Sequence, residues 1–223
     1  MIPLRDTVRS RTVPLVNYFL IAACAVVFLV ERSLGPRVDT FLHSFGVVPA
    51  SIVGAYHEGA HSIRLYVPLV TSMFLHGGWV HLIGNMLYLY IFGDNIEDRL
   101  GHLGYLVFYL LSGIGAAMTQ IFFDPASTVP LIGASGAIAG VLGAYFLLYP
   151  RARVLTLIPL VVFFPLVELP AFIFLGFWIV LQFLQAALST STDAAGGVAW
   201  WAHAGGFVVG AILLPLFLLV GKK

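Results

Sequence analysis

Long apolar segments separated by short polar ones dominate the pattern along this chain. A helix that crosses the hydrocarbon core of a membrane needs roughly 20 mostly apolar residues in a row. Six segments approach that length, and they cover residues 14–30, 79–96, 103–123, 133–149, 170–188 and 199–220. The pattern therefore predicts an all-α membrane protein in which six helices form a bundle.

The polar segments set the expected domain organisation. Residues 1–13 form an N-terminal segment, residues 14–220 form one transmembrane domain, and residues 221–223 form a C-terminal tail. Within the domain, the longest connection covers about residues 32–78.

The apolar stretch before the fifth predicted helix is too long for one span and is broken by Pro159, Pro165 and Pro170. A proline inside a helix removes a hydrogen bond and clashes with the preceding turn. We therefore expect residues 151–165 to form a connection at the membrane surface. Residues 189–197 are small and are expected to form a loop.

Composition agrees with this picture and narrows the function classes. The chain is 60% hydrophobic and 9% charged, whereas soluble domains carry about 25% charged residues. Its net charge of +1 gives no electrostatic basis for a nucleic-acid partner. The single cysteine, Cys24, excludes an internal disulfide and a zinc site built on cysteines. The expected surroundings are a lipid bilayer.

The distribution of lysine and arginine predicts the orientation, because cytoplasmic loops carry an excess of these residues. If the N-terminus lies inside, eight of the eleven basic residues face the cytoplasm, and six spans return the C-terminus there. These eight are Arg5, Arg9, Arg11, Arg99, Arg151, Arg153, Lys222 and Lys223. The long connection at about residues 32–78 then faces outward.

Four polar residues lie early in helices that run from the outside inward: His81, Asn85, Ser135 and His203. A helix rises about 1.5 Å per residue, so counting back from the inner ends puts them at similar depths, just below the outer surface. Polar groups inside a membrane are costly and are either paired for packing or functional.

These residue types suit nucleophilic catalysis. A serine needs a neighbouring base to accept its proton, and histidine is the usual base. Attack on a peptide carbonyl creates an oxyanion that needs preorganised donors. His81 and Asn85 are four residues apart and share a helix face, so both could supply N–H groups. The alternative is that the four residues only form hydrogen bonds between helices.

Glycines suggest how two of these helices meet. Small residues four apart let helix backbones approach closely. Such faces lie next to Ser135 and His203, and the glycines concerned are Gly133, Gly136, Gly140, Gly206 and Gly210. If the two faces pack together, Ser135 and His203 come within hydrogen-bond range.

The sequence resembles the rhomboid intramembrane serine proteases along nearly its whole length. The resemblance rests on His-Leu-Ile-Gly-Asn at 81–85, Gly-Ala-Ser-Gly at 133–136, and Ala-His-Ala-Gly-Gly at 202–206 followed by Gly210. Glu-Asp-Arg-Leu-Gly at 97–101 is also similar to a family motif, whose role there is structural.

The resemblance implies a fold, an activity and roles for individual residues. Ser135 would be the nucleophile and His203 the general base, in a dyad without an aspartate. His81, Asn85 and the Ser135 backbone N–H would form the oxyanion hole. Substrates would be membrane proteins with one transmembrane helix and small residues at the cut. No cofactor and no metal are implied.

Two positions depart from the pattern of some family members. Where they place an aromatic residue that packs against the catalytic histidine, four positions after the serine, this chain has Ala139. Where they carry a Trp-Arg pair in the first outer connection, Arg64 here follows Ile63.

Two other functions compete with this interpretation. Residues 57–61 match the zinc-protease motif H-E-x-x-H, with Asp39, His43 and His76 as conceivable third ligands. That motif works on a helix, whereas Gly59 lies within it. The second alternative is a non-proteolytic rhomboid-like module that binds membrane proteins. Such relatives typically lack the serine or the histidine, and this chain has both.

The fifth predicted helix is the expected gate for a substrate that enters sideways. It follows Pro165 and Pro170, which would weaken its tie to the preceding segment. Its bulky side chains could close a gap against the second helix, and they are Phe172, Phe174, Phe177 and Trp178. The alternative is that these side chains face lipid or belong to an ordinary core. The compact size and the lack of a recognisable transit segment favour a bacterial plasma (inner) membrane, with the active site near its outer face.

Overall fold

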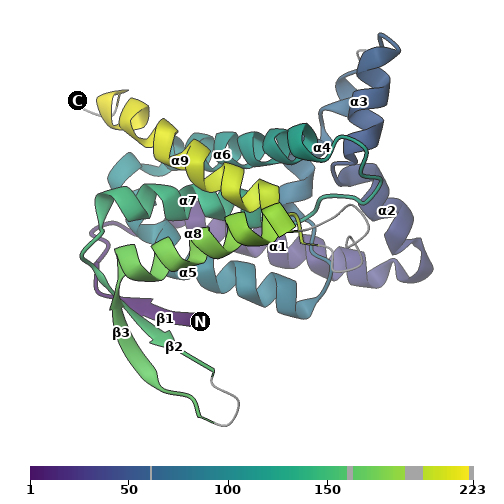
Figure 1. Cartoon of the computed structure of the whole chain (residues 1–223). Coiled ribbons are helices and arrows are strands. Elements are labelled where there is room, and N and C mark those ends of the chain that lie inside the picture. The colour runs from purple at the N-terminus through teal and green to yellow at the C-terminus, as the bar shows by residue number, and fades with distance from the viewer. Residues whose placement is uncertain (61, 160–162, 189–197, 221–223) are drawn as a thin grey trace.

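A computed structural model describes residues 1–60, 62–159, 163–188 and 198–220 of the chain, and most of them are helical (Figure 1). Six long helices follow the predicted order and begin within two residues of the predicted starts. They are α1 (Leu15–Ser33), α5 (Trp79–Leu100), α6 (His102–Phe123), α7 (Ser135–Leu148), α8 (Ala171–Leu188) and α9 (Trp200–Val220).

The number of spans is confirmed in part. Within the described residues, α1, α6, α8 and α9 are long and apolar enough to cross a membrane. Helix α5 becomes a fifth candidate if it is joined to the preceding segment Ile63–Phe74, from which it is bent by 81°. Helix α7 has only 14 residues. The protein is therefore a multi-pass membrane protein with four or five candidate spans and one shorter apolar helix.

The short helix α7 lies in the middle of the bundle. Its residues from Ala137 to Tyr145 are all buried, and it packs against α5, α6 and α9. A Cβ atom on Gly143 would overlap the backbone of Phe207 on α9. Close backbone contact of this kind fixes the relative position of α7 and α9.

A three-stranded antiparallel sheet was not expected, and it corrects the all-α prediction. Strand β1 (Ile2–Asp6) pairs with β2 (Arg153–Leu157), and β2 pairs with β3 (Leu166–Pro170). The sheet lies at one end of the bundle (Figure 1). In β2, Val154 and Thr156 are buried while their neighbours are less so, which is the period of two that a half-buried strand requires. Pro159 and Pro165 lie just outside the strands and Pro170 is the last residue of β3, so these prolines do not break a helix.

The long connection between α1 and α5 is mostly helical. It contains α2 (Val38–Phe45), α3 (Pro49–His57) and α4 (Pro68–Thr71). Short 3₁₀ turns precede α2, separate α3 from α4 and follow α4. Helices α2 and α3 lie at the end of the bundle opposite the sheet (Figure 1). The predicted loop 189–197 and tail 221–223 lie outside the described residues.

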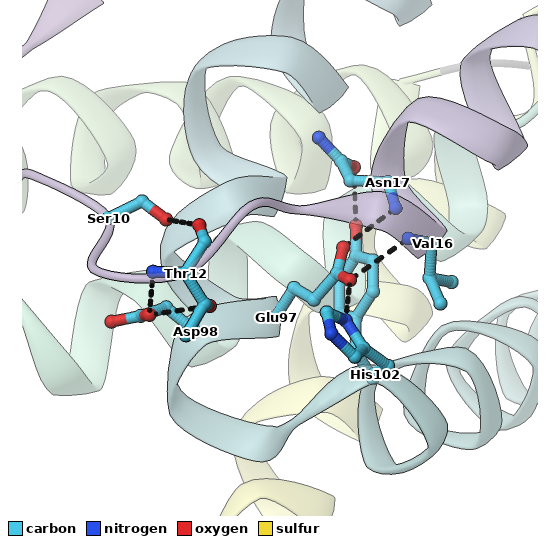
Figure 2. A network of polar contacts seen from close by, with 8 residues as sticks. Ser10, Thr12, Val16, Asn17, Glu97, Asp98 and His102 are labelled. Carbon is cyan, nitrogen blue, oxygen red and sulfur yellow. Dashed lines mark hydrogen bonds and ion pairs between the residues drawn. The ribbon is translucent and has the colours of Figure 1, made fainter.

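At the C-terminal end of α5, the carboxylate of Glu97 connects three helices (Figure 2). It accepts hydrogen bonds from the backbone N–H groups of Val16 and Asn17, at 2.9 and 2.7 Å, and lies 2.5 Å from Nδ1 of His102. The first N–H groups of a helix have no partner inside it, so Glu97 caps the N-terminus of α1.

Neighbouring polar groups extend this contact. The carboxylate of Asp98 accepts three hydrogen bonds from Arg11 and Thr12 in the segment before α1. The side chain of Asn17 accepts from the Tyr105 hydroxyl and donates to the carbonyl of Leu89. The segment 97–101 thus has contacts that suit a structural role.

Candidate active site

Ser135 and His203 are hydrogen-bonded to each other. Ser135 is the first residue of α7, and His203 lies in the first turn of α9. The Oγ atom of Ser135 is 2.7 Å from Nε2 of His203. The two helices approach closely here, since a Cβ atom on Gly206 would overlap the carbonyl oxygen of Gly136. The same relation holds between Gly210 and Gly140 one turn later.

The second ring nitrogen of His203 has a partner that sequence analysis missed. Its Nδ1 lies 2.7 Å from Oε1 of Gln182 on α8. Gln182 is only 7% exposed. The available signal was a glutamine within an otherwise apolar segment, but Gln185 gives the same signal and is exposed.

Aromatic side chains from α8 and α9 flank the His203 ring. The ring centroid of Trp178 lies 6.0 Å away, and that of Trp200 lies 6.1 Å away with its plane nearly perpendicular. Ala139 is buried on α7 and is too small to support the ring. The support therefore comes from α8 and the start of α9.

His81 and Asn85 on α5 face the backbone just before Ser135. Gly133 has φ +120°, and a Cβ atom there would lie 2.7 Å from Nε2 of His81 and 3.6 Å from Nδ2 of Asn85. Any side chain would thus clash, and its backbone angle favours glycine. This glycine lets the two side chains come close to the start of α7.

Both side chains have a nitrogen available to donate. The backbone N–H of Gly77 donates to Nδ1 of His81 at 3.4 Å, so the ring proton of the neutral imidazole is on Nε2. Among the described residues, Nδ2 of Asn85 is buried without a hydrogen-bond partner. The first N–H groups of α7 also have no partner within the helix. The two side-chain donors therefore lie close to Gly133, two residues before Ser135.

A cavity of about 850 Å³ opens onto these groups. His81, Asn85, Ser135 and His203 all line it. Its other walls come from α2, from the turn before α5 and from residues 129–132. It is large enough for a segment of extended peptide beside Ser135.

Comparison with known proteins identifies the architecture that carries this site. The family model described as "Rhomboid domain" matches residues 64–220. The chain belongs to the rhomboid family.

Individual rhomboids are similar to parts of the chain. Rhomboid protein 1, mitochondrial, of Saccharomyces cerevisiae is 30% identical over 156 residues, which are 66% of this chain and 40% of that protein. Rhomboid protease GluP of Bacillus subtilis is 35% identical over 132 residues, 59% of this chain and 24% of that protein. Rhomboid-like protein 11, chloroplastic, of Arabidopsis thaliana is 38% identical over 80 residues, 36% of this chain and 28% of that protein. The chain thus spans less than half the length of these relatives.

The four bulky residues expected to form a gate on α8 do not share one face in this rhomboid. Phe172 and Phe177 are half exposed on the outside of the bundle. Phe174 is 1% exposed, with its ring 6.4 Å from Tyr88 and 6.3 Å from Phe92 of α5. Only Phe174 has its ring packed against rings of α5.

The start of α8 is also better anchored than its prolines suggested. The backbone N–H of Ala171 donates to the carbonyl of Ala152, and that of Phe172 donates to the carbonyl of Pro150. Strand β3 leads directly into this turn and is paired with β2. The expectation that Pro165 and Pro170 loosen this end was wrong, because both lie where β3 and the helix start do not need their missing N–H groups.

The first histidine of the zinc motif is the last residue of its helix. Helix α3 ends at His57, Glu58 is its C-cap, and Gly59 has φ +68°. His61 lies outside the described residues. In the part of the chain that the structure describes, no three His, Cys, Asp or Glu side chains gather closely enough to hold a metal ion.

Proposed function

We propose that this rhomboid is an intramembrane serine endopeptidase that uses Ser135 as nucleophile and His203 as general base. The observation that carries the proposal is the 2.7 Å contact between Oγ of Ser135 and Nε2 of His203. The two residues come from different helices and both line the cavity. A serine bonded to an imidazole in this way is activated for attack on a carbonyl.

The acceptor and donor groups around Ser135 suggest the steps of the reaction. Nε2 of His203 accepts the Ser135 proton as Oγ attacks the peptide carbonyl, and it later delivers that proton to the leaving amine. Negative charge then develops on the carbonyl oxygen. The Ser135 backbone N–H, Nε2 of His81 and Nδ2 of Asn85 would stabilise it as an oxyanion hole. Water, activated by His203, would release the acyl group from Ser135.

The proposed substrates are membrane-anchored proteins, cleaved within or next to a transmembrane helix. A helical segment satisfies its own backbone groups in the bilayer, so it must unwind before its carbonyls reach Ser135. Small residues that weaken the helix would favour cleavage. The proposed setting is the plasma (inner) membrane, with six spans, cytoplasmic termini and the site near the outer face. The distribution of basic residues supports this orientation.

The test is cleavage of a fluorescently labelled single-span substrate in proteoliposomes by purified wild type, Ser135→Ala and His203→Ala. Nucleophile and base act as a unit, so each variant should fall to background while its thermal unfolding stays unchanged. Matched controls are Ser33→Ala and His57→Ala, since both residues are exposed and lie outside the cavity. Both controls should retain wild-type rates.

The alternatives give different outcomes. Residual cleavage by Ser135→Ala would overturn the serine mechanism. Cleavage lost in His57→Ala and on chelation would favour the zinc protease. A wild-type protein that captures the substrate without cutting it would instead be a membrane-protein binding module.

A further inference from the structure

Helix α8 reaches the Ser135–His203 pair through two residues one turn apart. Gln182 bonds to Nδ1 of His203, and Trp178 packs against the same ring. Residues four apart lie on one helix face. This face of α8 is therefore directed at His203 rather than at lipid.

The hydrogen bonds of Gln182 determine which way its amide points. Its Nε2 donates to the backbone carbonyl of Trp178 at 3.4 Å. A carbonyl oxygen can only accept, so the NH₂ group faces Trp178 and Oε1 faces His203. Oε1 is itself an acceptor, so Nδ1 of His203 must be the donor. The proton of the neutral imidazole is then on Nδ1.

This proton position decides whether His203 can work as a base. With the proton on Nδ1, Nε2 carries a lone pair and accepts the hydrogen of the Ser135 hydroxyl. With the proton on Nε2, the ring would face Oγ of Ser135 with an N–H group and could not take its proton. An amide supplies the required acceptor without placing a charged carboxylate inside the membrane, where a charge is costly.

We propose that Gln182 is a positioning residue that holds His203 in the tautomer able to deprotonate Ser135. The proposal rests on the proposed peptidase function, since it assigns a partner to the base of that reaction. It also makes activity depend on the position of α8, because the acceptor is carried by that helix and by no residue of α7 or α9.

The decisive variants change the acceptor and keep the volume. Gln182→Met removes the acceptor oxygen, and Gln185→Met is the matched control, since Gln185 is exposed on the same helix. With the single-span substrate in proteoliposomes, kcat of Gln182→Met should fall about 10- to 100-fold, the loss expected for one strong hydrogen bond. KM should stay unchanged, and the unfolding temperature should fall by no more than the loss of one buried hydrogen bond explains. Gln185→Met should match wild type.

A second variant tests the hydrogen bond through the pH dependence. Gln182→Glu keeps an acceptor and adds a carboxylate, which favours the protonated ring, so the acidic limb of the pH–rate profile should move to higher pH. Among the described residues, the polar groups that act on His203 are His81 from α5, Ser135 from α7 and Gln182 from α8. Among them only His81 is ionisable near neutral pH, and it is unchanged in the variant.

The outcomes separate this inference from the proposed function. A kcat of Gln182→Met within twofold of wild type would overturn the positioning role. So would a fall in activity that disappears when the rate is expressed per folded molecule. If Gln182→Met does not fold, an unshifted acidic limb in Gln182→Glu overturns it instead. In each of these cases Ser135→Ala would remain inactive, whereas failure of the proposed function would show as cleavage by Ser135→Ala.

Discussion

At the end of the bundle that carries the sheet, the buried carboxylate of Glu97 has several hydrogen-bond donors, whereas near Ser135 the buried amide nitrogen of Asn85 lacks an acceptor among the described residues. Glu97 is fully buried and accepts from two backbone N–H groups and from His102. At the other end, Nδ2 of Asn85 is buried without a partner among the described residues. Leaving a buried donor unsatisfied costs about 1–3 kcal/mol. The contacts of Glu97 thus stabilise the fold. The unpaired nitrogen of Asn85 costs stability, and a substrate oxygen that accepts from it would offset that cost.

This comparison predicts that mutation near Ser135 lowers kcat, whereas mutation at the sheet end lowers stability. The largest effect on kcat in this comparison is expected at Asn85. Asn85→Ala should lower kcat by roughly 10²-fold or less, because a single oxyanion donor contributes a few kcal/mol to the transition state. KM should hardly change, since the charge develops after binding. Stability should not fall through a lost hydrogen bond, because the side-chain nitrogen has no partner among the described residues. A raised KM with unchanged kcat would show that Asn85 binds substrate instead.

The reverse is expected at Glu97. Glu97→Ala should lower the free energy of unfolding by about 2–4 kcal/mol, because it leaves the N–H groups at the start of α1 without acceptors. The kcat per folded molecule should stay near wild type. Thermal unfolding in detergent, with active-site titration of the folded fraction, measures both. Glu168→Gln is the matched control, since that carboxylate is exposed on β3, and it should leave stability unchanged. A large loss of kcat in folded Glu97→Ala would show that Glu97 affects catalysis as well as stability, and would contradict the comparison.

The smallest effect is expected where α8 meets α5. Phe174→Val should weaken the contact with Tyr88 and Phe92 and raise cleavage of a single-span substrate a few-fold, if movement of α8 limits entry. Cleavage of a small soluble ester should change less. Phe177→Val is the matched control, because Phe177 is exposed, and both rates should stay at wild-type values. A parallel fall in both rates for Phe174→Val would identify Phe174 as ordinary core.

The pairing of Ser135 with His203 could be anticipated from local information. Span boundaries give each residue a depth, and glycines four apart give a packing face. Gln182 could not be found this way. Its role depends on how α8 is rotated against α9, and nothing in an apolar helix distinguishes Gln182 from Gln185 before the helices are packed.

The sheet escaped prediction for a different reason. Strand β1 pairs with β2, about 150 residues later in the chain. A strand is stabilised mainly by its contacts with such a partner, and local sequence does not reveal that partner. In a chain this apolar, the hydropathy of a five-residue strand such as Arg153–Leu157 differs little from that of the flanking segments. Pro159, Pro165 and Pro170 indicate breaks in a helix, but prolines equally mark the ends of strands.

The anchoring of α8 turns this helix into a lever. Its first turn is hydrogen-bonded to the link between α7 and β2 and follows directly on β3, and Gln182 lies eleven residues after the helix start. At 1.5 Å per residue the arm is about 16 Å long, so a tilt of about 10° would move Gln182 by about 3 Å. That displacement is enough to break the bond to His203. A small tilt of α8 that admits a substrate would therefore also release His203, the proposed base, from Gln182. The reaction could then proceed only after α8 has returned to its original position.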